Sequence, residues 1–147
     1  MLSVGDEAIS VRVGGQLFAL DIMSVREIRG WTASTPLPHA PPYVLGMINL
    51  RGLVLPVFDL AGRLGLAAGI PDASSVVVVV DVGDRQVGLV VEAVCDILIV
   101  GADMLQPAPD VGGAETRSLV QGVLTLKEGI VTILSLTDLV PEMALAA

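Results

Sequence analysis

The side chain best placed to do chemistry is a single arginine at a predicted hairpin turn. Residues 46–60 read GMINLRGLVLPVFDL, which are two apolar runs that meet at Arg51 and Gly52. Gly52 can adopt the positive φ angle that a hairpin loop requires, so Arg51 is predicted to lie at the rim of a sheet. A guanidinium pairs well with carboxylates and often anchors interfaces. We therefore expect Arg51 to be an isolated charge at an apolar rim, close to the functional site.

The chain offers one histidine and one cysteine as further reactive groups. A single histidine such as His39 cannot form a zinc site without other donors. Cys95 lies on a β-type segment and is predicted to be a buried structural thiol, and His39 a surface residue, although a Cys–His pair formed in space stays an alternative. One cysteine also excludes an internal disulfide and fits a reducing compartment. We expect no metal and no cofactor.

Motifs typical of enzymes are missing from the sequence. It contains no G-x-x-x-x-G-K-[ST] phosphate loop, no G-x-G-x-x-G and no G-x-S-x-G nucleophile turn. The 16 acidic residues are spread over loop starts and turns, where they cap and solubilise rather than form a general acid–base pair. These observations favour a binding module over an enzyme.

The charge distribution excludes two further classes of partner. The net charge is −8, and the 8 basic residues are scattered singly along the chain. Nucleic acids and anionic membrane surfaces both require a clustered cationic patch. No apolar run approaches the roughly 18–20 residues of a membrane span, and the N-terminus has no basic segment typical of a secretory signal. We therefore expect a cytoplasmic protein without direct membrane insertion.

Short apolar or alternating runs, separated by glycine turns, predict an all-β protein built as a barrel or a sandwich. Strands are expected at 8–13, 16–20, 46–50, 53–58, 75–82, 86–91, 119–126 and 130–136, with helical turns at 60–65 and 137–140. Asp59 is predicted to cap the first of these turns. Segment 21–28 has mixed periodicity and fits either a short helix or a twisted edge strand.

The sequence contains an internal repeat. Residues 14–28 align without gaps on 83–97, and 46–60 align on 122–136 in the same order. This duplication predicts two similar small barrels of about five strands each. The alignment places Glu27 on Asp96 and Arg51 on Lys127. It also gives equivalent places to four apolar residues that belong either to the core or to a binding surface: Val25, Ile28, Val94 and Ile97.

The region 25–60, VREIRGWTASTPLPHAPPYVLGMINLRGLVLPVFDL, resembles the signature region of the CheW family of bacterial chemotaxis coupling proteins. The most specific part is the run P-Y-V-x-G-x-I-N-L-R-G-x-x-L-P-V-x-D-L, and the resemblance extends over roughly 8–140. It implies two intertwined five-stranded SH3-like β-barrels with a few short helical turns. The whole chain, 1–147, would form a single CheW-like domain of two barrel subdomains, with loose ends at 1–7 and 141–147.

The same resemblance implies a non-catalytic adaptor that couples the cytoplasmic tips of chemoreceptors to a CheA-type histidine kinase. Such a protein would be recruited to membrane-associated receptor arrays, and a groove floored by apolar side chains would take one face of the receptor's helical hairpin. The implied receptor-binding residues are Val25, Glu27, Gly46, Arg51 and Ile97. The kinase-facing residues are not assigned. Two alternatives stay open: an isolated regulatory domain of a larger signalling protein, which the lack of a linker at either end disfavours, and a small β-barrel enzyme.

Overall fold

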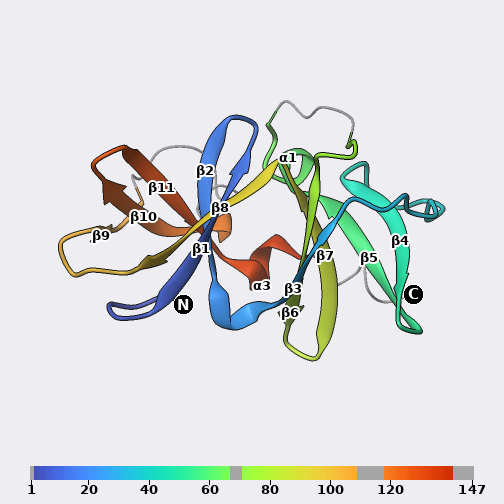
Figure 1. Ribbon diagram of the computed structural model, residues 1–147, viewed down its shortest axis with the longest axis horizontal. Helices are drawn as coiled ribbons and strands as arrows, with labels where there is room; N and C mark the ends of the chain where they lie inside the picture. The colour runs from blue at the N-terminus through green and yellow to red at the C-terminus, as the bar shows by residue number, and fades with distance from the viewer. Residues whose placement is uncertain (1, 67–70, 109–117, 141–147) are drawn as a thin grey trace.

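A computed structural model describes residues 2–66, 71–108 and 118–140 and shows an all-β chain (Figure 1). In the first half the strands are β1 (Glu7–Val13), β2 (Gln16–Asp21), β3 (Val25–Gly30), β4 (Val44–Leu50) and β5 (Leu53–Asp59). In the second half they are β6 (Val76–Val82), β7 (Arg85–Val91), β8 (Ala93–Ile99), β9 (Leu105–Gln106), β10 (Val120–Leu126) and β11 (Gly129–Leu134). The helical elements whose bounds lie within the described residues are single turns: η1 (Ile22–Ser24), α1 (Leu60–Arg63) and α3 (Leu136–Leu139).

The strands form two sheets that exchange strands between the two halves of the chain. A six-stranded sheet has the order β8-β1-β2-β11-β10-β9, and a five-stranded sheet has the order β3-β6-β7-β5-β4. Each sheet therefore takes strands from both halves, as the two sides of Figure 1 show. Neighbouring strands are antiparallel, except that β2 pairs with β11, and β5 with β7, in parallel. The predicted all-β, intertwined architecture is confirmed.

The internal repeat is visible in the order of the strands. β8, β1, β2, β11 and β10 occupy the same places in one sheet as β3, β6, β7, β5 and β4 in the other. The equivalent hairpins β4–β5 and β10–β11 also carry a bulge at the same place, between Val44 and Gly46 and between Val120 and Gly122. The sixth strand, β9, has only an isolated bridge between Thr35 and Met47 as its counterpart. The two sheets are thus related by an approximate twofold axis.

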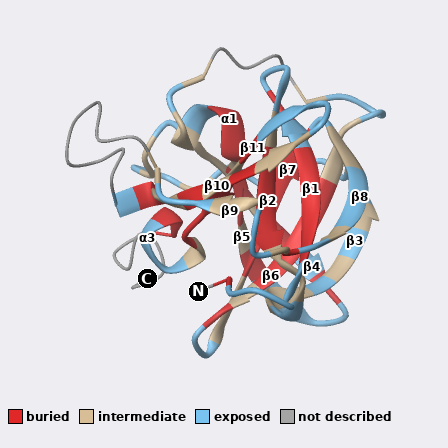
Figure 2. Ribbon diagram, turned by 90° about the vertical axis from the view of Figure 1, so that its left-hand side faces the viewer, coloured by how far each residue is buried: buried red, intermediate tan, exposed pale blue. Residues whose placement is uncertain are grey.

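The largest apolar core lies between the sheets and contains residues from both. It includes Phe58 and Leu89 of the five-stranded sheet and Leu20 of the six-stranded sheet, all fully buried. β6 reads VVVVVDV and is buried on both faces, because one face meets this shared core and the other meets a smaller cluster around Leu55 and Val79. β-branched side chains suit such a strand. Figure 2 shows the buried interior and the more exposed strands β3 and β8 beside it.

The structure bears on three segments whose form the sequence left open or predicted differently. Residues 1–7 were expected to be loose, yet Leu2 is buried and the Gly5 amide donates to the Val100 carbonyl at 2.8 Å. Segment 21–28 contains both predicted alternatives, a 3-10 turn followed by strand β3. The segment after β7, where no strand was expected, forms strand β8. The predicted loose end at 141–147 lies outside the described residues.

Asp59 stands at the N-cap position of α1, although its carboxylate makes no capping hydrogen bond there. Burial raises the pKa of this carboxyl group, and the nearby amides of Gly62 and Ala61 act in the opposite direction. The predicted position of the helical turn is therefore right. The Asp59 carboxylate lies near the Gly62 and Ala61 amides of this turn, which lower its pKa, although no capping hydrogen bond of good geometry forms.

Candidate functional site

The tip of the β4–β5 hairpin is a two-residue loop formed by Arg51 and Gly52. Both residues have positive φ angles, 52° for Arg51 and 88° for Gly52, as a type I′ turn requires. The Gly52 amide donates to the side-chain oxygen of Asn49 at 2.8 Å, which holds the loop closed. Glycine at the second position was expected, but the left-handed backbone of Arg51 was not. This turn fixes where the guanidinium leaves the sheet.

Arg51 is paired rather than isolated. Its Nη2 atom donates to Oε1 of Glu27 on β3, and Nη1 of Arg29 lies 3.5 Å from the other carboxylate oxygen of Glu27. The hydrogen bond from Arg51 lowers the pKa of Glu27, and the same contact raises the pKa of Arg51. The side chain of Arg51 is nevertheless 72% exposed, against 25% for Glu27. The expectation of an isolated charge is therefore wrong, because a carboxylate from another strand reaches the tip.

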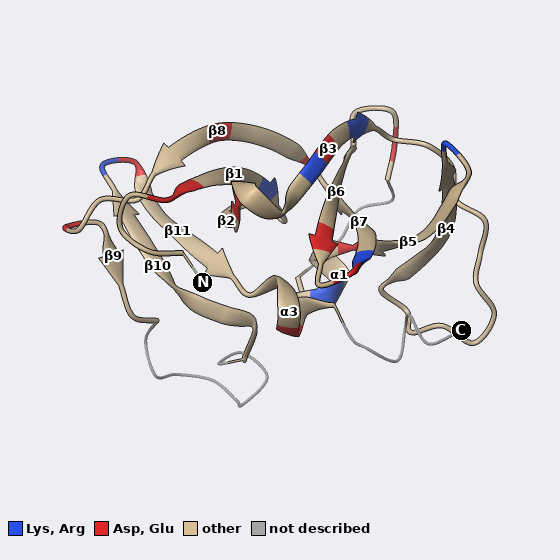
Figure 3. Cartoon of the chain, turned by 90° about the horizontal axis from the view of Figure 1, so that it is seen from below, with Lys and Arg blue, Asp and Glu red and all other residues tan. Residues whose placement is uncertain are grey.

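The Glu27–Arg51 ion pair joins the two edges of the five-stranded sheet. Glu27 lies on the edge strand β3, and Arg51 ends the opposite edge strand β4. An exposed ion pair contributes little to stability. Its consequence is geometric, because it brings the edges of a curled sheet together and directs the remaining guanidinium donors toward solvent. Figure 3 shows positive charge at β3 and at the β4–β5 tip, on the same end of the sheet.

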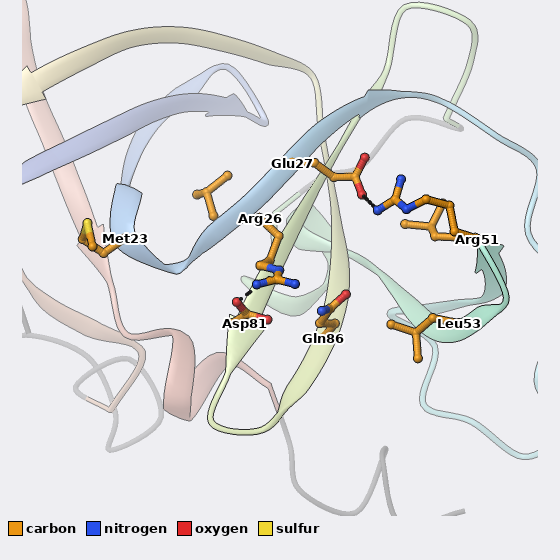
Figure 4. A pocket seen from close by; sticks show the side chains of 9 residues that line it. Met23, Arg26, Glu27, Arg51, Leu53, Asp81 and Gln86 are labelled. Carbon is orange, nitrogen blue, oxygen red and sulfur yellow. Dashed lines mark hydrogen bonds and ion pairs between the residues drawn. The ribbon is translucent and has the colours of Figure 1, made fainter.

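A depression of about 700 Å³ lies next to this ion pair (Figure 4). Its lining includes three of the five predicted receptor-binding residues, Val25, Glu27 and Arg51. A second ion pair, between Nε of Arg26 and Oδ2 of Asp81 at 3.5 Å, lies on its other side. The remaining lining residues are Met23, Leu50, Leu53 and Gln86. The depression is therefore lined mainly by polar groups, with charges of both signs beside a few apolar side chains.

The four apolar residues at equivalent places in the two repeats form what we call the edge strip: Val25, Ile28, Val94 and Ile97. They lie directly opposite four members of the shared core, in order Val80, Val78, Val11 and Ile9. Directly opposite side chains of antiparallel strands share a face, so all four point toward the space between the sheets. Both edge strands lie on the same side of the molecule (Figures 2 and 3).

The edge strip is only partly covered. Val25 and Val94 are half-buried and pack against the shared core. Ile28 is 47% exposed and Ile97 is 59% exposed. The sequence left open whether these four residues belong to the core or to a binding surface. In the structure the two valines belong to the core, while the two isoleucines face solvent.

Gly46 lies outside the depression and has a structural reason to be glycine. Its φ angle is 149°, and a Cβ atom there would lie 2.3 Å from the carbonyl oxygen of Thr35. That carbonyl accepts a hydrogen bond from the Met47 amide at 2.7 Å, so the segment before β4 is held against the strand. Gly122 is the equivalent residue, and a Cβ atom there would lie 2.8 Å from the carbonyl oxygen of Gln106. A receptor contact at Gly46 stays a prediction.

Cys95 is exposed on β8, so the prediction of a buried structural cysteine is wrong. Val94 points toward the shared core, so alternation along the strand places the side chain of Cys95 on the opposite, uncovered face of this edge strand. Within the described part of the chain, no group of three or more His, Cys, Asp or Glu residues could hold a metal ion. Among the same residues, no helix is long and apolar enough to cross a membrane.

Arg29 and the Arg26–Asp81 pair were missed by the sequence analysis. One signal was available for Arg29, because alternation along VREIRG places it on the same strand face as Glu27. No comparable signal existed for Arg26 and Asp81, which meet only because β3 pairs with β6, a strand from the other half of the chain.

The fold and the site together define a class: an all-β module of two intertwined sheets that presents a partly exposed apolar strip beside fixed charges. Comparison with known proteins gives the family. The model of the CheW-like domain matches residues 7–143. The chain is 49% identical over 138 residues to the chemotaxis protein CheW of Rhizobium meliloti (strain 1021), covering 94% of this chain and 89% of that protein.

Two further comparisons agree. A probable chemotaxis protein CheW of Rhizobium etli is 46% identical over 142 residues, covering 96% of this chain and 92% of that protein. The crystal structure of the scaffolding protein TtCheW from Thermoanaerobacter tengcongensis superposes with a TM-score of 0.84 at 27% identity, covering 92% of each chain. This chain belongs to the CheW family, and the expectation of a chemotaxis scaffold is confirmed.

Proposed function

We propose that this protein is a non-catalytic cytoplasmic adaptor that couples the cytoplasmic tips of chemoreceptors to a CheA-type histidine kinase at membrane-associated arrays. Family membership supports the adaptor role, as does the high identity to a protein named for chemotaxis. The similar Thermoanaerobacter protein is described as a scaffold. The predicted single-domain organisation is part of this proposal.

The receptor docks on the edge strip between β3 and β8. The observation that carries this assignment is the exposure of Ile28 and Ile97, which are aligned with core residues yet left uncovered. A chemoreceptor tip is a helical hairpin, and one apolar face of a helix can lie along such a strip. Val25 and Val94 form its floor, because they are fixed against the shared core.

The Glu27–Arg51 pair sets the register of the receptor along this strip. Glu27 lies opposite Val79 and so points to the other face of β3 from Ile28, which places the ion pair at the flank of the strip. Its charges are held there by Arg29 and by the hairpin turn. Fixed charges at the rim of an apolar contact favour one orientation and disfavour others. The predicted receptor-binding residues Val25, Glu27, Arg51 and Ile97 therefore act as one surface, and Gly46 supports the hairpin that carries it.

The kinase domain docks elsewhere, at apolar hairpin ends, so that both partners bind at once. Val54, just after the β4–β5 turn, and Ile130, just after the β10–β11 turn, occupy equivalent places and are both exposed. Neither residue belongs to the edge strip. Exposed aliphatic side chains at such ends suit the apolar core of a protein interface.

The test is a pair of pull-down assays with a receptor-tip fragment and with the regulatory domain of the kinase. Ile97→Asp is expected to abolish receptor binding and keep kinase binding, because it puts a charge into the apolar contact alone. The doubly substituted variant Val54→Asp/Ile130→Asp is the matched control, and the opposite pattern is expected of it. If Ile97→Asp binds the receptor fragment as well as the parent protein does, the docking site is assigned wrongly.

A further inference from the structure

The helical turns α1 and α3 are equivalent elements that follow β5 and β11. Arg63 is the last residue of α1, and its counterpart in the repeat is Leu139, the last residue of α3. These two residues are in direct contact. Nε of Arg63 donates to the Leu139 carbonyl at 2.8 Å, and Nη2 donates to the Asp138 carbonyl at 3.2 Å. The approximate twofold axis therefore passes close to this contact.

The two repeats carry different residues at this position, and the difference allows a contact between the two halves of the chain. Leu139 is fully buried in the shared core, whereas Arg63 places its guanidinium against the end of α3. The last carbonyls of a helical turn have no partner within the turn, and a cation is favourable there. The Arg63 guanidinium also lies 5.2 Å from the centre of the Tyr43 ring.

This contact runs from one sheet to the other. α1 continues directly from β5 of the five-stranded sheet, and α3 follows β11 of the six-stranded sheet after one residue, Ser135. Tyr43 extends this series of contacts into the core, because its ring packs edge-on against Phe58 with the ring centroids 5.7 Å apart. In Figures 1 and 3, α3 lies in the middle of the molecule between the sheets. Apolar packing is non-directional, whereas two hydrogen bonds from one rigid fork are directional.

We propose that Arg63 is a positioning residue, which fixes the relative orientation of the two sheets and thereby the spacing of the edge strip. The strip takes Ile28 from the five-stranded sheet and Ile97 from the six-stranded sheet, so its shape depends on the angle between them. The contacts of Arg63 described above are with Leu139, Asp138 and Tyr43, and none of these residues belongs to the strip. Its effect on docking rests on the proposed function, but its effect on sheet orientation does not.

The direct test is a distance measurement between the sheets by double electron–electron resonance. The native Cys95 is exposed on β8 and supplies one spin-label site, and Val54→Cys on β5 supplies the other. A single narrow distance distribution is expected with Arg63 present. Arg63→Ala is expected to broaden it, and Arg63→Lys to give an intermediate width, because lysine keeps the charge but loses the fork. An unchanged distribution in Arg63→Ala overturns the proposal. If Arg63→Ala does not fold, the same criterion applies to Arg63→Lys.

A second readout separates positioning from stability. Val131→Ala removes buried apolar volume from a cluster on the far side of the six-stranded sheet and is the matched control. At conditions where all variants are folded, Arg63→Ala is expected to bind a receptor-tip fragment roughly 2- to 30-fold more weakly, as for residues that act through packing. Val131→Ala is expected to bind like the parent protein.

The outcomes distinguish this proposal from the proposed function. If the parent protein does not bind the receptor fragment while the distance distribution of Arg63→Ala broadens, the proposed function fails and the role of Arg63 in sheet orientation stands. If the distribution broadens and the affinity is unchanged, sheet orientation does not control docking, and the positioning role is overturned. Equal losses of affinity in Arg63→Ala and Val131→Ala also overturn it.

Discussion

Arg51 carries two constraints at one position, a left-handed backbone and a charge held by a carboxylate from another strand. The sequence predicted the turn from the Arg51–Gly52 pair, and it predicted that the side chain would stand at the rim. It could not predict the partner, because Glu27 lies 24 residues earlier in the chain and reaches Arg51 only when the sheet curls. The local sequence pattern thus identifies Arg51 as the exposed turn residue, whereas only the tertiary structure identifies Glu27 as its partner.

Substitution of Arg51 is expected to separate docking from folding. Arg51→Asn removes the charge but suits the left-handed turn, since asparagine tolerates that conformation. Arg51→Glu places a second carboxylate beside Glu27. Both variants are expected to keep a cooperative thermal transition close to that of the parent protein, because an exposed ion pair contributes little to stability. Both are expected to lose receptor-tip binding in a pull-down assay.

The charge-swapped variant Glu27→Arg/Arg51→Glu shows whether the pair contacts the receptor or only holds the strip in shape. It restores an ion pair between the same two positions while reversing both charges toward the partner. We expect the swap to fold normally and to stay deficient in receptor binding. Recovery of full binding would mean that the pair acts only by joining the sheet edges.

At the scale of elements, the two hairpins β4–β5 and β10–β11 show how much a duplicated pattern predicts. Their strands and the helical turns after them were predicted from the sequence, whereas the bulge that both hairpins share was not. Strands β3 and β8 were harder, because each contains a bulge that interrupts the alternation of side chains. Cys95 was wrongly expected to be buried because the sequence did not show that its face of the edge strand β8 is left uncovered.

Gly46→Ala is expected to destabilise the protein by roughly 1–3 kcal/mol, the usual cost of a non-glycine residue in a glycine-only backbone region. Its φ angle is 149°, and the new Cβ atom would meet the Thr35 carbonyl. Urea denaturation measures the change. Gly122→Ala, where the equivalent contact is 2.8 Å and not 2.3 Å, is the matched control and is expected to cost less. An equal or larger loss in Gly122→Ala would contradict this explanation.

Asp59→Asn is expected to stabilise the protein at neutral pH. Burial raises the pKa of Asp59 above its ordinary value of 3.8, so the folded state binds a proton more tightly than the unfolded state does. Stability from this group therefore falls as pH rises from the unfolded pKa through the folded pKa. Asparagine is as good as aspartate at an N-cap and carries no charge.

Melting temperatures at neutral pH and near pH 4 test the Asp59 prediction. The advantage of Asp59→Asn is expected to be largest at neutral pH and to shrink toward acid, where Asp59 itself becomes protonated. A difference that grows as the pH falls would have the wrong sign and would contradict the prediction.

At the scale of the whole molecule, strand exchange makes the two sheets depend on each other. The duplication predicted two similar units, and the resemblance to the CheW family implied that they intertwine. Composition and periodicity alone gave no reason for β3 to pair with β6 rather than with a strand of its own half, because such pairing depends on long-range contacts. The edge strip exists only as a result of this exchange, since β3 and β8 become edges of different sheets.

Leu89→Ala is expected to lower the free energy of unfolding by about 2–5 kcal/mol, because Leu89 is fully buried in the core that both sheets share. Unfolding should stay a single transition, since neither sheet keeps its core when the other unfolds. Fluorescence of Trp31, which packs near the five-stranded sheet, and far-ultraviolet circular dichroism are expected to report the same midpoint. Separate midpoints would contradict a shared core.

The most direct test of the docking surface is an NMR titration of the isotope-labelled protein with a receptor-tip fragment. The largest shifts of backbone amides are expected along β3 and β8 and at Arg51, with Ile28 and Ile97 among them. Amides near Ile130 are expected to change little. Shifts concentrated at the β10–β11 hairpin, with β3 and β8 unaffected, would contradict the assignment of the edge strip as the receptor site.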